Sequence, residues 1–254
     1  MADFFATIGA WFAQASVSLG EFGEFFLSVS QSISGGLGVT LGLFFGTIVL
    51  SIPLGLILSL GAAADTRPVG GRRTAVKTLL AVLQKIIKFY IWVLRGTPLL
   101  LQLLFIYYGL ATMFDIKLDN FTAAIVAFAL NYAAYFAEIF RAGIQSVERG
   151  QYEAARALGL SSGAMMFRVV IPQMVRTVLP PVGNEAITLV KDTSLVSIIA
   201  LSDILNRTKN IVMREADVAP FIVAAVFYLV MTFILTKLFA YLEKRASVSE
   251  LQVL

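Results

Sequence analysis

The chain contains no cysteine and no histidine. These two absences exclude disulfide bonds, thiol nucleophiles and histidine-based metal or acid–base sites. An enzyme built on this chain would have only carboxylates and hydroxyls for its chemistry, so an enzymatic function fits poorly. Charge is also scarce, because 14% of the 254 residues are charged whereas a typical soluble domain has about 25%.

Apolar residues are abundant instead, at 58% of the chain, and several apolar stretches exceed the ~18 residues that a membrane-spanning helix needs. The stretch 78–114 would be about 55 Å long as one helix, too long for a single crossing of ~30 Å. We therefore expect 78–88 to enter along the interface and 89–111 to cross. The sequence predicts an all-α membrane protein with five transmembrane helices, at 39–63, 89–111, 121–140, 180–201 and 218–241.

The basic residues predict the orientation of these spans. No Lys or Arg precedes Arg67, whereas the loop 64–77, the loop 141–176 with five arginines, and the C-terminal segment are all basic. Because basic loops stay in the cytoplasm, we expect the N-terminus outside and the C-terminus cytoplasmic. The N-terminal residues lack a basic region and a small-residue cleavage site, so no signal peptide is expected.

Residues 4–33 carry apolar side chains at helical spacing with polar residues between them. This pattern predicts an amphipathic helix within a separate N-terminal region, 1–36. Two interpretations remain open: the helix lies on the outer face of the membrane, or it packs on the helix bundle.

Polar residues near the middle of three predicted spans are the main functional signal. They are Arg95, Thr97 and Gln102 in the second span, Asn131 in the third, and Lys191 and Asp192 in the fourth. A charge at the centre of a spanning helix costs about 2.5–3.5 kcal/mol, so retention by chance is a poor explanation. In "RGTP", Gly96 and Pro98 also predict an interrupted or kinked helix, which membrane proteins tolerate where backbone is buried or lines a wet cavity.

A cation from the second span and a carboxylate from the fourth would suit a zwitterionic ligand in a cavity at the membrane midplane. Glu185, Thr188 and Asp192 share one helical face. The alternative is a structural ion pair between helices. For Asn131, an interhelical hydrogen bond is an equally good explanation, and the role of Lys191 stays open.

The loop 141–176 contains a short helical pattern, with Gly159 as its expected stop, followed by a second short helix that Pro172 is expected to end. Glu153-Ala154-Ala155, then Gly159, then residues 169–172 match the spacing E-A-A-x3-G-x9-I-x-L-P. This pattern resembles the EAA signature of ATP-binding-cassette importer permeases. "RGTPLLLQLLFIYYGL" and "GNEAITLVKDTSLVSI" look like the subfamily for polar amino acids, of the histidine, glutamine, arginine and glutamate type. The resemblance covers about residues 38–244.

The resemblance implies a type I, MetI-like permease fold in the cell inner membrane, with a transmembrane domain at 37–244, the EAA coupling loop at 141–176 and a short cytoplasmic tail at 245–254. It implies a second permease copy or related chain, a cytoplasmic ATPase dimer and an extracytoplasmic amino-acid-binding protein as partners. No P-loop sequence occurs in the chain. No cofactor is expected on this chain, and ATP and Mg²⁺ are expected on the ATPase.

The resemblance also implies the site residues. Those expected at the substrate are Arg95, Gly96, Thr97, Pro98, Gln102, Asn131, Asp192, Thr193 and Ser194, and those expected to couple to the ATPase are Glu153, Ala154, Ala155, Gly159 and Leu160. Asp192 would accept the α-ammonium, and Arg95 or backbone near the RGTP break would take the α-carboxylate. The alternatives are the non-substrate-binding half of a heterodimeric permease and an ion-gradient-driven secondary transporter, although the latter has no use for an EAA loop.

Overall fold

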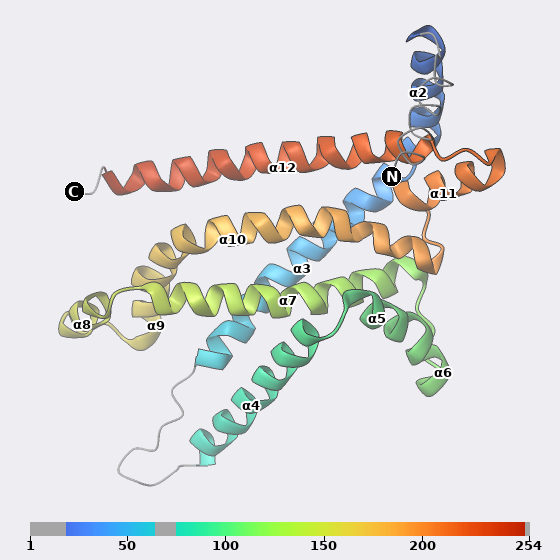
Figure 1. The fold of residues 1–254 in the computed structure, drawn as a ribbon. Helices are drawn as coiled ribbons and strands as arrows, with labels where there is room; N and C mark the ends of the chain where they lie inside the picture. The colour runs from blue at the N-terminus through green and yellow to red at the C-terminus, as the bar shows by residue number, and fades with distance from the viewer. Residues whose placement is uncertain (1–18, 64–74, 252–254) are drawn as a thin grey trace, which may run out of the picture.

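The computed structural model describes residues 19–63 and 75–251, and within these ranges the chain forms helices and connections without a strand. Figure 1 shows the helices α2 (Leu19–Ser34), α3 (Leu37–Ala63), α4 (Ala75–Gly96), α5 (Leu99–Leu104), α6 (Leu110–Phe114), α7 (Asn120–Ser146), α8 (Arg149–Ala157), α9 (Ser162–Met165), α10 (Ile171–Asp192), α11 (Ile204–Glu215) and α12 (Pro220–Leu251). Two π-helical turns, η1 (Phe105–Gly109) and η2 (Met166–Val170), and one 3-10 helix, η3 (Thr193–Ile199), join them. The predicted all-α class is confirmed.

Helix α7 is the centre of the bundle, with α3, α4, α5 and α10 packed against it and α12 beyond α10 (Figure 1). Many of its buried residues are alanines, and the large side chains of Phe128, Tyr132 and Phe136 are almost completely buried. Small residues let helices approach closely, which is how helices associate where no water drives them together.

Three helices, α3, α7 and α12, are long and apolar enough to cross a membrane, and α4 with α5–α6 adds a fourth at most. The predicted span 180–201 is not among them, because α10 carries Arg176, Glu185, Lys191 and Asp192. Helix α10 nevertheless lies beside α7 and α12 over its length (Figure 1). The count of five crossing segments stays a prediction.

Two predicted boundaries were wrong. Helix α4 runs unbroken through residues 88 and 89, so 78–88 is not a separate interfacial segment. Pro172 does not end a helix, since it lies in the first turn of α10, where a missing N–H removes no bond of that helix. Helix α10 then continues through Pro180 and Pro181.

The predicted break at RGTP is confirmed. Helix α4 ends at Gly96, and the chain turns by 107° before it continues as α5 and α6. Pro98 has an extended ψ of 134° and forms the N-cap of α5. Proline lacks the N–H that would continue α4, and it disfavours the helical conformation at Thr97, so the two helices separate here.

Of the predicted amphipathic helix 4–33, residues 4–18 lie outside the described residues, and the rest forms α2. Val29 and Ile33 are buried, and α2 contacts α11 and α12. Phe22, nearer the start of α2, is 49% exposed. The C-terminal half of α2 therefore packs on the bundle.

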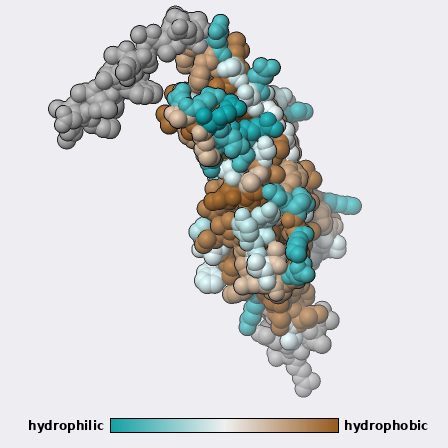
Figure 2. Space-filling view, turned by 90° about the vertical axis from the view of Figure 1, so that its right-hand side faces the viewer, coloured by the Kyte–Doolittle hydropathy of each residue, from teal (hydrophilic) through white to brown (hydrophobic). Residues whose placement is uncertain are grey.

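The two ends of the bundle differ in the segments they carry. Helices α8 and α9 lie at the same end as the C-terminal end of α12, and α2, α6 and α11 lie at the other (Figure 1). Figure 2 looks at the end that carries α2, α6 and α11, where hydrophilic residues gather in patches between hydrophobic ones. The loop 141–176 and the C-terminus thus share one end, as the predicted orientation requires. The membrane side itself stays a prediction.

At the end that carries α11, two helices have an aspartate as their N-cap. Asp119 caps α7 by accepting hydrogen bonds from the backbone N–H groups of Phe121 and Thr122, both at 3.1 Å. The hydrogen bond with Thr122 lowers the pKa of Asp119. Asp203 caps α11 in the same way, and its burial raises its pKa. Such caps satisfy backbone donors that a helix start leaves free.

Glycine fixes the distance between α3 and α7 at one contact. A Cβ atom on Gly55 would lie 2.7 Å from the Cβ of Phe136, and 3.1 Å from both the carbonyl oxygen of Ala133 and the backbone nitrogen of Ala137. Two of these neighbours are backbone atoms of a packed helix, so they have little freedom to move.

We predict that Gly55→Ala lowers the stability of the protein by about 1–3 kcal/mol, the usual cost of an overpacked core. The thermal unfolding midpoint in detergent measures this effect. Gly38→Ala is the matched control, since Gly38 is on the same helix and a Cβ atom added there would have nothing within 4 Å. Alanine favours helix over glycine by about 1 kcal/mol, so the control should be unchanged or slightly more stable. Equal midpoints for the two variants would contradict this prediction.

Candidate functional site

The carbonyl of Leu94 is left without its helical partner, because the residue four positions on is Pro98, which has no N–H. Two side-chain amides replace that donor: Gln102 Nε2 at 2.9 Å and Asn131 Nδ2 at 3.1 Å. The hydroxyl of Thr97 donates to the carbonyl of Val93 at 2.9 Å. The backbone groups freed at the break are therefore satisfied by side chains.

Gln102 and Asn131 are also bonded to each other, since Asn131 Nδ2 lies 2.9 Å from Gln102 Oε1. Gln102 Nε2 is within 3.1 Å of the carbonyl of Thr97 and 2.8 Å of its hydroxyl. Of the two explanations for Asn131, the interhelical hydrogen bond is therefore present. Both amides join α7 and α5 to the end of α4.

Arg95, Gly96, Thr97 and Pro98 are all exposed at the break. The guanidinium carbon of Arg95 lies 5.4 Å from the ring centroid of Tyr135, a cation–π contact with α7. Arg95 also lines a cavity of about 380 Å³ between α4 and α7. Its charge is thus directed to an open space beside the bundle core.

Asp192 is the last residue of α10, where the helix tightens into η3. The hydroxyl of Tyr132 on α7 donates to Asp192 Oδ2 at 2.8 Å, and the carboxylate is partly buried. Thr193 is buried and its hydroxyl donates to the carbonyl of Val190 at 2.7 Å, whereas Ser194 is partly exposed. A second interruption, the change from α10 to η3, therefore lies directly beside the carboxylate of Asp192.

No ion pair within the described residues joins Arg95 or Lys191 to Asp192; the pairs there include Lys117–Asp115, Arg141–Glu138 and Arg214–Glu215. Lys191 is exposed on the opposite edge of α10 from the bundle core. The alternative of a structural ion pair between Arg95 and Asp192 is therefore not realised in this structure.

Glu185 is a further charged residue of this region, and the predicted substrate residues do not include it. It is half-buried on α10 and interacts electrostatically with Asp192 and with Arg95. Its place on the same helical face as Asp192 was the available signal. Tyr132 and Tyr135 were also missed, although they follow Asn131 by one and four residues and so lie at a similar depth.

Helix α10 carries a polar face that the rest of the described chain leaves uncovered. Arg176, Thr177, Asn184, Thr188 and Lys191 are all exposed and fall on one side of the helix. Polar side chains of a membrane helix face the bundle interior or a water-filled cavity and not lipid. This face is therefore suited to a second chain or an aqueous path.

The predicted coupling residues lie in and directly after α8. Glu153 and Ala154 are exposed, Ala155 is buried, and Leu160 packs against the hydrophobic core. Gly159 has a positive φ of 72°, and the N–H of Leu160 reaches the carbonyl of Ala155 at 3.1 Å. Glycine adopts this conformation readily, so the predicted stop at Gly159 is confirmed.

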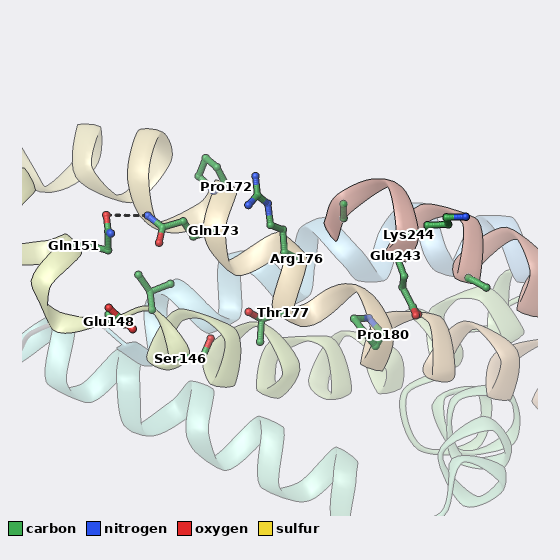
Figure 3. A pocket seen from close by; sticks show the side chains of 13 residues that line it. Ser146, Glu148, Gln151, Pro172, Gln173, Arg176, Thr177, Pro180, Glu243 and Lys244 are labelled. Carbon is green, nitrogen blue, oxygen red and sulfur yellow. Dashed lines mark hydrogen bonds between the residues drawn. The ribbon is translucent and has the colours of Figure 1, made fainter. Parts of the chain in front are cut away.

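Helix α8 is tied to two long helices. The hydroxyl of Tyr152 donates to the carbonyl of Ile144 on α7 at 2.8 Å, and Gln173 on α10 donates to Gln151 at 3.3 Å (Figure 3). Beside these contacts lies a cavity of about 970 Å³ between α8, α10 and α12. Figure 3 shows Arg176 from α10 and Glu243 from α12 among the side chains that line it.

Residues 74–248 match the family described as binding-protein-dependent transport system inner membrane component. This chain belongs to that family. The chain is 38% identical over 202 residues to the arginine transport system permease protein ArtQ of Bacillus subtilis. The match covers 79% of this chain and 86% of that protein. The chain is also 38% identical over 163 residues to the glutamine transport system permease protein GlnP of Escherichia coli, covering 63% and 74% of the two chains.

Solved structures agree with this assignment. The structure described as an amino acid ABC transporter with histidines is 36% identical, with a TM-score of 0.75 over 86% of this chain and 96% of that chain. The inward-facing MetNI methionine transporter is 16% identical, with a TM-score of 0.65 over 86% and 95%, and shows the fold alone. The predicted MetI-like fold and the resemblance to importer permeases are confirmed. The transport component is a protein of the inner membrane and not an enzyme.

We predict that Asn131→Leu destabilises the transport component by about 1–3 kcal/mol, because it removes a donor from the carbonyl of Leu94 and leaves the carbonyl of Gln102 unpaired. The unfolding midpoint in detergent measures the loss. Thr236→Ala is the control, since Thr236 is exposed and bonds only within its own helix. An Asn131→Leu midpoint as high as that of the control would mean that the break does not depend on this amide.

Proposed function

We propose that this chain is the permease subunit of an ATP-driven amino acid importer that works by alternating access around a midplane amino acid site. The observation that carries the proposal is a set of charges next to two helix ends: Arg95 lies at the RGTP break and Asp192 at the end of α10, and Glu185 on α10 interacts electrostatically with both. No ion pair in the described part of the chain joins them. Unpaired opposite charges at this depth are costly, and a zwitterion supplies both missing partners.

In the proposed site, Asp192 accepts the α-ammonium of the substrate and is held in position by the hydroxyl of Tyr132. Arg95 or backbone near Gly96 takes the α-carboxylate. The amides of Gln102 and Asn131 hold the break open and position Arg95, since both are bonded to the carbonyl of Leu94.

Glu185 gives the site a second carboxylate against one guanidinium. An amino acid with a basic side chain would balance this excess of negative charge. The relatives named as arginine permeases, from Bacillus subtilis and Escherichia coli, are consistent with such a substrate. A basic amino acid is therefore the substrate class that we propose.

The exposed polar face of α10 supports a second permease chain, identical or related, with the translocation path between the two. The exposed Glu153 and Ala154 of α8 and the 80% exposed side chain of Leu158 offer a surface to a cytoplasmic ATPase. That partner would bind ATP and Mg²⁺. An extracytoplasmic binding protein would deliver the substrate at the end that carries α6 and α11.

Coupling follows from the ties of α8. Closure of the ATPase dimer would move α8, and the bonds of Tyr152 and Gln151 would carry this movement to α7 and α10. These two helices hold Tyr132 and Asp192, so the same displacement reaches the site.

We predict that Asp192→Asn lowers amino acid uptake at least about tenfold, since hydrogen bonds to charged groups are worth about 1.5–3 kcal/mol. Uptake and ATPase activity are measured in proteoliposomes that contain the chain, its ATPase and its binding protein. Basal ATPase activity should persist. Glu24→Gln, a carboxylate exposed on α2, is the control. Unimpaired uptake by Asp192→Asn would assign recognition to the second permease chain and make this chain the non-binding half.

We further predict that Glu185→Gln lowers the uptake of arginine about tenfold more than that of glutamine, because only arginine presents an additional charge to this carboxylate. Competition between the two labelled amino acids in the same proteoliposomes measures the ratio. Asp192→Asn serves as the comparison, since it should weaken both substrates alike. An equal loss for arginine and glutamine would remove Glu185 from side-chain recognition.

A further inference from the structure

The cavity of about 380 Å³ between α4 and α7 has a chemistry that the proposed substrate site does not explain. The two helices diverge toward the end that carries α8, and the end of α3 closes a third side with Ala62 (Figure 1). Lys88, Trp92 and Arg95 of α4 line it, as do Arg141 and Gln145 of α7.

Hydrogen-bond donors dominate this cavity. Both carboxylate oxygens of Glu138, the one acidic residue in its lining, are taken by Arg141. Arg141 uses a further N–H on Gln145 at 2.7 Å, which leaves two of its five N–H groups. Lys88 has no ion pair among the residues that the structure describes. The groups left over are thus an ammonium, guanidinium N–H groups and the amide nitrogen of Gln145.

The position of Lys88 fixes its depth. It lies two helical turns, about 10 Å, from Arg95 toward the predicted cytoplasmic side. Between them Trp92 is 72% exposed, and tryptophan is enriched where the hydrocarbon meets the headgroups. Phe89, which follows Lys88 on α4, is 63% exposed, and its ring centroid lies 6.0 Å from that of Trp92. A fitting ligand is therefore anionic at one end and apolar at the other.

We propose that this cavity binds the phosphate of an anionic phospholipid from the cytoplasmic leaflet. Lys88, the free N–H groups of Arg141 and the amide of Gln145 hold the phosphate, and an acyl chain lies along Phe89 and Trp92. Basic pockets between membrane helices on the cytoplasmic side bind such headgroups. Arg95, at the deep end, stays available to the substrate. The lipid fills the wedge below the RGTP break and fixes α4 against α7.

The test is a titration of the purified transport complex with phosphatidylglycerol and with phosphatidylcholine, read as lipid occupancy by native mass spectrometry. Wild type should bind phosphatidylglycerol more tightly. Lys88→Gln should weaken that binding about fivefold, the equivalent of ~1 kcal/mol for one basic residue, and leave phosphatidylcholine unchanged. Lys85→Gln is the matched control, because Lys85 is exposed one turn earlier on the same helix and does not line the cavity.

Equal binding of the two lipids, or an equal effect of Lys85→Gln, would overturn the proposal. Displacement of bound phosphatidylglycerol by inorganic phosphate alone would identify a free-anion site instead. Displacement by the transported amino acid would assign the cavity to the translocation path. The titration needs no transport activity, so its failure and the failure of the proposed function can be told apart.

Discussion

The site depends on the hydrogen bonds that replace the one Pro98 cannot donate to the carbonyl of Leu94. The carbonyl of Leu94 needs a hydrogen-bond donor, and Gln102 and Asn131 supply it from α5 and α7. Without these amides the break would expose an unsatisfied carbonyl, which costs several kcal/mol in lipid. With them, the chain turns by 107° at a fixed place and leaves Arg95 exposed at the turn. Gln102 and Asn131, both expected at the substrate, thus also stabilise the backbone at the break.

Helix α10 reaches the site in a different way. Its polar residues make it a poor membrane span by composition, yet it lies beside α7 and α12. The two facts are compatible because its faces are divided: Ala186, Leu189 and Val190 are buried in the bundle, whereas Asn184 and Lys191 are exposed. An exposed polar face on a membrane helix needs a partner or water. The single chain is therefore one wall of the proposed path.

The sequence was sufficient for features that depend on local chemistry. Pro98 and Gly159 act through backbone geometry, so the break and the end of α8 could be predicted from single residues. Hydropathy alone does not locate the same break, because residues 78–114 are apolar on both sides of it. The shared helical face of Glu185 and Asp192 was a local signal, but the interaction of Glu185 with Arg95 and the hydrogen bond of Tyr132 to Asp192 depend on which helices meet. The amide pair formed by Gln102 and Asn131 was likewise visible only once α5 and α7 were placed together.

The same contacts explain how a cytoplasmic movement would reach the site in the proposed mechanism. Helix α8 contacts few other elements, so its position is set mainly by Tyr152 on the carbonyl of Ile144 and by Gln151 on Gln173. From Ile144, α7 continues without a break to Tyr132, and from Gln173, α10 continues to Asp192. Tyr132 and Asp192 are bonded to each other. Two unbroken helices therefore join one coupling segment to one hydrogen bond at the site. The broken helix α4 has no tie to α8 among the described contacts, so a shift of α7 and α10 together would move Asp192 relative to Arg95 and alter the fit for a zwitterion held between them.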